Sequence, residues 1–91
     1  MMYPKILSVK TISETLLLVE FDNAAKRIYD IKPLLEKPMF YPLKKMAFFR
    51  NVQVDDGGYA IFWNKDIDLS EYELWMHGKP IENNDYEPTN N

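Results

Sequence analysis

The sequence lacks most of the residues on which catalytic and metal centres are built. It has no cysteine and a single histidine among 91 residues. Without cysteine there can be no disulfide framework, no thiolate nucleophile and no cysteine-ligated zinc. One histidine cannot supply a metal site with several histidine ligands. We therefore expect no cofactor, no metal site and no enzymatic activity.

Long apolar segments are also missing. Residues 1–5 lead directly into a short strand-like segment, without the apolar stretch of a signal peptide. No stretch of the chain is apolar for long enough to cross a bilayer. We expect a cytoplasmic protein that does not associate with membranes.

The charge balance is mildly acidic. Fourteen acidic residues outnumber eleven basic ones, which gives a net charge of −3. An acidic protein has no long-range attraction for phosphate backbones, so direct nucleic-acid binding is disfavoured. Residues 82–91 carry part of the acidity and contain no basic residue. We predict one domain over residues 1–80 and a disordered acidic tail over residues 81–91.

Hydrophobic residues make up 46% of the chain, which is enough to build a core without disulfides or metals. The first half contains three runs of β-branched and aliphatic residues separated by turn residues. They are residues 5–11, 15–21 and 26–31. In the first run, alternation places Leu7, Val9 and Thr11 on one face and Ile6 on the other. Three antiparallel strands are predicted.

The second half changes pattern. Pro33 fits the first turn of a short helix that ends before Pro38, and residues 44–50 have helical spacing. Residues 39–43 form an apolar connection between these two helices. A second hairpin follows, with strands over residues 52–54 and 59–63 around a turn of two aspartates and two glycines.

The last predicted helix has the clearest beginning. Ser70 and Glu73 form a capping box, in which each side chain bonds the other residue's backbone N–H. Gly78 and Pro80 mark the end of the helix. The chain is therefore predicted to be a single small α+β domain. Its mostly antiparallel sheet is made of two hairpins plus an extra strand, with two or three short helices on one side.

Large aromatic residues are the most informative feature of the predicted surface. Tyr72, Trp75 and Met76 share one face of the last helix by the i, i+3, i+4 rule. This stripe can pack on the sheet or against another molecule, and it is our candidate interaction surface. Trp63 is predicted to lie in the core.

A weaker candidate surface is basic. Lys44, Lys45 and Arg50 accompany Phe48 and Phe49, a mixture found on nucleic-acid-binding surfaces. The alternative is a solvated helix face, which we favour because Phe49 is needed in the core and the chain is acidic.

Acidic residues and the lone histidine give no further site. Two aspartates in the turn of the second hairpin and two after Trp63 could in principle bind a divalent cation. They are Asp55, Asp56, Asp66 and Asp68. A hairpin strand would hold the two pairs at opposite ends, so we interpret them as turn residues. His77 lies in the last turn of a helix, where a protonated imidazole interacts favourably with the helix dipole.

Residues 30–36 read D-I-K-P-L-L-E, and residues 61–63 end in a tryptophan that is followed by an acidic turn. The order of these features resembles the DUF2442 family of small bacterial proteins. The first hairpin carries Asn23-Ala24 where the family often has Asn-Gly, and Asn64-Lys65-Asp66 replaces a Pro-Asn-Gly type turn. The resemblance covers residues 5 to about 75 and rests on residues 30–40, 43–44, 48–49, 52–55, 61–63 and 66–69.

The resemblance implies an α+β fold and no established active site. Family members often occur beside a second small protein, and some carry an added helix-turn-helix, which suggests a toxin–antitoxin or similar paired system. We thus expect an interaction module that binds a neighbouring gene product or forms a homodimer, plausibly as the antitoxin-like member. The alternatives are a transcriptional regulator that acts on nucleic acid through a partner and, least favoured, a carboxylate-based metal enzyme.

Overall fold

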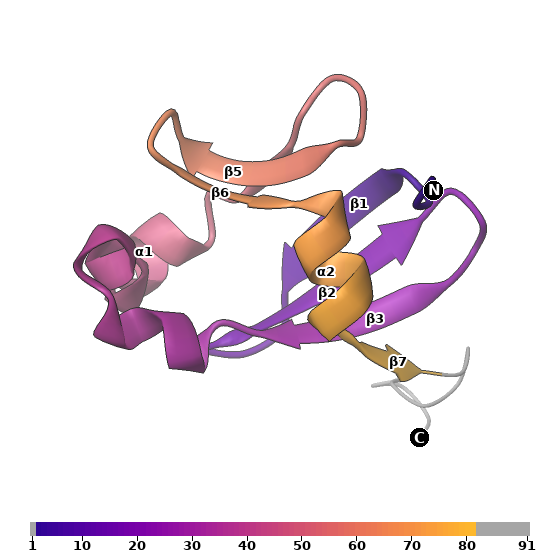
Figure 1. The fold of residues 1–91 in the computed structure, drawn as a ribbon. Helices are drawn as coiled ribbons and strands as arrows, with labels where there is room; N and C mark the ends of the chain where they lie inside the picture. Colours follow the sequence, from indigo (N-terminus) through magenta and orange to yellow (C-terminus); the bar gives the residue numbers. More distant parts are fainter. Residues whose placement is uncertain (1, 82–91) are drawn as a thin grey trace.

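The computed structural model describes residues 2–81, which form two antiparallel sheets and several short helices (Figure 1). The larger sheet has the strand order β1-β2-β3-β7. Its strands are β1 (Ile6–Thr11), β2 (Leu16–Phe21), β3 (Lys26–Asp30) and β7 (Lys79–Ile81). The smaller sheet contains β4 (Gln53–Val54), β5 (Ala60–Asn64) and β6 (Ile67–Ser70).

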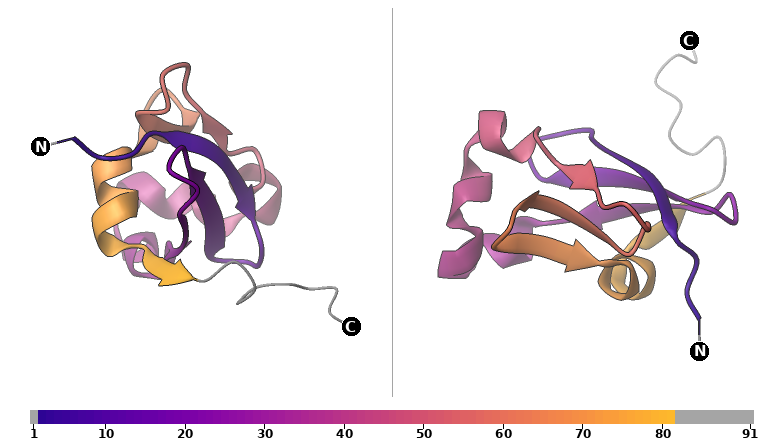
Figure 2. Two further views of the ribbon diagram at one scale, coloured as in Figure 1. Left: turned by 90° about the vertical axis from the view of Figure 1, so that its right-hand side faces the viewer. Right: turned by 90° about the horizontal axis from the view of Figure 1, so that it is seen from above.

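The helices are short, and two of them are 3₁₀-helices. They are η1 (Lys32–Glu36), η2 (Pro38–Lys44), α1 (Met46–Phe49) and α2 (Glu71–His77). Proline lies in the first turn of both η1 and η2, where its fixed φ favours helix initiation. Figure 2 shows that η1, η2 and α1 gather at the end of the molecule away from the β2–β3 turn.

The predicted α+β class is confirmed, and the structure adds two strands that the sequence did not reveal. β6 follows β5 and completes the smaller sheet, and β7 pairs with β3 after α2. The predicted strands are thus divided between two sheets instead of sharing one. Ile81, which we assigned to the tail, is the last residue of β7. The remainder of the predicted tail lies outside the described residues.

A β-bulge changes which side of β1 faces the core. The pairing register with β2 shifts between Ile6 and Ser8, so one extra residue is inserted into β1. Ile6 is buried and Val9 packs against the core, whereas Leu7 is 59% exposed. The predicted alternation, which put Leu7 and Val9 on one face, is wrong for this reason.

The turn between β2 and β3 holds a residue with positive φ. Ala24 has φ of 72°, a left-handed conformation that glycine adopts more easily than alanine. The Asn23 side chain stabilises the turn by accepting a hydrogen bond from the Ala25 N–H at 3.0 Å. This hairpin therefore forms with alanine at a position that favours glycine.

The core lies between the two sheets and α2. β2 contributes Leu17, Val19 and Phe21, none of which is exposed to solvent. Phe49 and Trp63 stack with ring centroids 6.2 Å apart, and the Trp63 indole donates a hydrogen bond to the Phe49 carbonyl at 2.8 Å. Both aromatic residues are buried, which confirms that they belong to the core.

Gly58 connects the smaller sheet to β1. Its carbonyl accepts a hydrogen bond from the Ile6 N–H at 2.8 Å. Its φ is 75°, and a Cβ at this position would lie 2.6 Å from the Ile6 carbonyl oxygen. Only glycine fits both the conformation and the close approach.

Candidate functional site

Helix α2 has a buried side that faces the core, an exposed outer face, and two partly buried flanks between them. Leu74 is completely buried and marks the direction of the core. Tyr72 and Met76, at the opposite side, are 46% and 51% exposed, and we call this pair the outer face of α2. Trp75 lies on one flank and Glu73 on the other. The predicted stripe of Tyr72, Trp75 and Met76 is therefore only partly an open surface.

The Trp75 flank is closed by packing. The Trp75 ring meets Phe21 edge to face, with centroids 5.1 Å apart, and the Arg27 guanidinium lies 3.7 Å from its centroid. The Arg27 Nε atom is buried and has no hydrogen-bond partner within residues 2–81. Burial lowers the pKa of Arg27. Trp75 thus contributes to the fold of this domain.

The Glu73 flank contains a hydrogen bond between elements that are far apart in sequence. Tyr29 is buried in β3, and its hydroxyl donates to Glu73 Oε2 at 2.7 Å. A buried tyrosine hydroxyl needs such an acceptor. Burial is the main cause that raises the pKa of Tyr29, and the hydrogen bond and the charge of Glu73 add to it. Tyr29 therefore remains a neutral donor at physiological pH.

This contact corrects half of the predicted capping box. Ser70 does accept a hydrogen bond from the Glu73 N–H, at 3.1 Å. In the described part of the chain the Glu73 carboxylate does not return to the Ser70 N–H but accepts from Tyr29. The hydroxyl of Tyr29 would otherwise be buried without a partner, whereas Ser70 is exposed.

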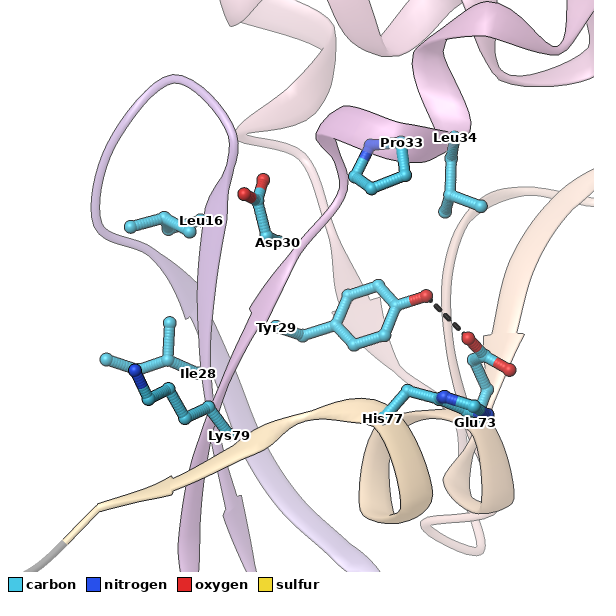
Figure 3. Close-up of a pocket in the computed structure, with 9 residues that line it drawn as sticks. All are labelled: Leu16, Ile28, Tyr29, Asp30, Pro33, Leu34, Glu73, His77 and Lys79. Atoms are coloured by element: carbon cyan, nitrogen blue, oxygen red, sulfur yellow. Dashed lines mark hydrogen bonds between the residues drawn. The ribbon is translucent and has the colours of Figure 1, made fainter.

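A pocket of about 680 Å³ opens beside the Tyr29–Glu73 pair. Figure 3 shows Tyr29, Glu73 and His77 on one side of β3 and Leu16, Ile28 and Lys79 on the other. The pocket residues thus come from both faces of the sheet and from α2 and η1. They are Leu16, Ile28, Tyr29, Asp30, Pro33, Leu34, Glu73, His77 and Lys79.

The pocket exists because β7 is shorter than β3. β7 pairs with β3 only from Lys26 to Ile28, so Tyr29 and Asp30 extend beyond it. η1 begins two residues after Asp30 and brings Pro33 and Leu34 to the opposite wall. The edge of the sheet is therefore open between η1 and the end of α2.

Gly78 brings α2 close to β3 at this edge. Its N–H donates to the Leu74 carbonyl at 3.0 Å and ends the helix, as predicted. A Cβ at Gly78 would lie 2.4 Å from that carbonyl oxygen and 3.0 Å from Arg27 Cβ. The close approach, which only glycine permits, places both flanks of α2 against β3.

A comparison with protein families identifies the chain. The model described as "Protein of unknown function (DUF2442)" matches residues 6–80. The chain belongs to the DUF2442 family. Comparisons of this DUF2442 protein with curated proteins and with solved structures each gave no match.

The three basic residues that we considered for nucleic-acid contact in this DUF2442 protein lie around α1. Lys44 ends η2, Lys45 precedes α1 and Arg50 follows it, and all three are exposed. Of the accompanying aromatic residues, Phe49 is fully buried in the core, and Phe48 is partly buried and packs against the core. The Phe49 ring is therefore not accessible for base stacking.

The four aspartates that we considered as possible cation ligands lie around strand β5 of the smaller sheet. Asp55 and Asp56 precede β5, and Asp66 follows it at the opposite end of this strand. Asp68 lies in β6, where it pairs with Phe62 in the middle of β5. Residues 2–81 contain no group of three or more histidine or acidic side chains that could hold a metal ion. No helix in this part of the chain is long and apolar enough to cross a membrane.

Sequence reasoning missed Tyr29 and the pocket. Tyr29 and Glu73 are 44 residues apart, and no local pattern relates them. A partial signal was present, because Glu73 and His77 are four residues apart and share one face of α2. The tertiary structure was needed to place Tyr29 beneath that face.

Proposed function

We propose that this DUF2442 protein is a non-enzymatic interaction module that binds a protein partner through the outer face of α2. The observation that carries the proposal is the exposure of Tyr72 and Met76, one helical turn apart on the same face. Tyrosine and methionine are enriched in protein interfaces, where their large flexible or amphipathic side chains become buried. An interaction would remove this apolar area from water.

The N-terminal segment enlarges the outer face and holds it in place. Tyr3 meets Tyr72 edge to face, with ring centroids 5.2 Å apart. Lys5 forms an ion pair with Glu71 at 2.9 Å, which ties the segment to the first turn of α2. A partner would therefore meet a preformed surface and lose little conformational entropy of this chain on binding.

Charge favours a different protein over a second copy. The chain has a net charge of −3, so two copies repel one another, whereas a basic partner is attracted. The proposed partner is a basic neighbouring gene product, with this chain as the antitoxin-like member of a cytoplasmic paired system. A homodimer is the competing outcome.

The test is copurification of the untagged neighbouring gene product with the tagged protein. We expect the complex to be retained by the wild type and lost from a Tyr72→Ala/Met76→Ala variant. The control variant is Leu7→Ala, which removes an equally exposed side chain from β1. Retention of the partner by the double variant would exclude the outer face as its site. A dimer of the isolated protein in light scattering, with no neighbour retained, would favour self-association instead.

A further inference from the structure

The pocket at the β3 edge combines aliphatic walls with an anionic group. Pro33 and Leu34 from η1 and Leu16 and Ile28 from the sheet provide apolar lining. Glu73 provides a carboxylate that already has a defined orientation, because Tyr29 donates to its Oε2 atom at 2.7 Å. The pocket volume, about 680 Å³, is within the range of ligand-binding cavities.

The second oxygen of Glu73 is available to a ligand. Within residues 2–81 the only hydrogen bond that the carboxylate accepts is the one from Tyr29 to Oε2. Oε1 is not a buried atom left without a partner, so it is reached by solvent. An exposed carboxylate oxygen at the side of an apolar pocket is suited to a hydrogen-bond donor that carries a positive charge.

The other charged groups of the pocket do not neutralise this position. In Figure 3 the Lys79 side chain extends toward Ile28 and away from Glu73. Asp30 adds a second carboxylate at the rim, whose Oδ1 accepts from the Lys32 N–H at 2.9 Å. His77 lines the same side of the pocket as Glu73. Among the residues that line the pocket, the only ammonium group is that of Lys79, and it is directed away from Glu73.

We propose that this pocket binds an ammonium or guanidinium group on an aliphatic stem, with Glu73 as the counter-ion and Leu34 and Pro33 against the stem. A small free amine and a lysine or arginine side chain of another protein share this chemistry. The site lies on the Glu73 flank of α2 and does not depend on the outer face or on the partner proposed for it.

The test is an NMR titration of the whole protein with N-acetyl-lysine methylamide, using N-acetyl-norleucine methylamide as the uncharged isostere. We expect saturable amide shifts at Leu34, Glu73 and His77 with the lysine compound and much weaker binding of the norleucine compound. Equal affinity for the two compounds, or no shift at millimolar concentrations of the lysine compound, would overturn the proposal.

Variants and a second ligand complete the experiment. Glu73→Gln keeps an acceptor for Tyr29 but removes the charge, and we expect it to weaken binding about tenfold. Glu14→Gln removes an exposed charge from the β1–β2 turn and should leave binding unchanged. Equal losses in both variants would show nonspecific attraction and contradict the proposed site. Butylamine distinguishes the sources: affinity equal to that of the lysine compound indicates a free amine, and weaker binding indicates a side chain within a polypeptide.

Discussion

The two flanks of α2 use the same strand in different ways. On one flank, Trp75 packs on Phe21 and beneath Arg27, and the space is filled. On the other, Glu73 accepts a hydrogen bond from Tyr29, and a pocket remains beside the pair. Arg27 and Tyr29 are both on β3, two residues apart. A large aromatic residue of the helix fills the space on one flank, whereas on the other the pairing of β7 with β3 ends before Tyr29 and leaves the pocket open.

Removing the residue between the flanks should have the largest effect. Leu74→Ala creates a cavity beneath α2 and is expected to lower the free energy of unfolding by about 2 to 5 kcal/mol. Leu74 holds α2 against the core between the two flanks. The variant should therefore also lose the NMR amide shifts that the lysine compound causes at the pocket. Urea denaturation measures the change, and Leu7→Ala on exposed β1 is the control, with a change under about 0.5 kcal/mol. A Leu74→Ala effect as small as that of the control would show that α2 is not anchored by this residue.

The closed flank should be the more sensitive of the two. Trp75→Ala removes the contacts with Phe21 and Arg27, and because the ring is half-buried we expect a loss of about 2 kcal/mol in urea denaturation. An unchanged free energy of unfolding, combined with weaker binding of the protein partner, would mean that Trp75 contacts the partner and does not stabilise the fold.

The open flank should respond less. Tyr29→Phe keeps the ring and removes one hydrogen bond to a carboxylate that solvent can reach, so the expected loss is about 1 kcal/mol. A loss larger than that of Trp75→Ala would reverse the comparison between the flanks.

The pH dependence of stability separates the flanks in another way. The pKa of Tyr29 is raised in the folded protein above its ordinary value of about 10. The unfolded chain therefore loses this proton first as the pH rises. The stability that depends on the neutral hydroxyl is fully present below about pH 10 and is lost as the pH rises from there toward the folded pKa. Between about pH 8 and about pH 11, the free energy of unfolding measured by urea denaturation should decrease less for Tyr29→Phe than for the wild type. Identical decreases would contradict the raised pKa.

The outer face should contribute least to stability. Met76→Ala removes a side chain that is half exposed, and we expect a change within about 0.5 kcal/mol. Thermal unfolding measures it, with Leu74→Ala as the buried comparison on the same helix. A large loss would place Met76 in the fold and remove it from the proposed interface.

Local patterns predicted most of the elements of this fold. Runs of β-branched and aliphatic residues separated by turn residues predicted the β2–β3 hairpin, and Ser70 and Gly78 predicted the ends of α2. β7 was missed because it has only three residues and one of them is Pro80, so its sequence shows no strand pattern. Its extended conformation is stabilised by pairing with β3. The face of β1 was misassigned because a bulge depends on the register with β2.

The sequence predicted the exposed face of α2 but not its buried side or the pocket. Helical spacing identified the face shared by Tyr72 and Met76, since i, i+4 neighbours meet on any helix. It could not decide between Leu74 and Trp75 as the centre of the buried side, because that depends on what lies beneath the helix. The pocket arises from the length of β7 relative to β3, which is a property of their pairing.

The sequence by itself determined an α+β domain without the residues for thiolate or multi-histidine chemistry. Those conclusions follow from composition and local periodicity, which act over a few neighbouring residues. Only the tertiary structure decided that Trp75 packs inward, that Tyr29 meets Glu73 and that a pocket opens beside them. Contacts between residues 44 positions apart depend on how the sheets and α2 pack together, and no local pattern encodes that packing.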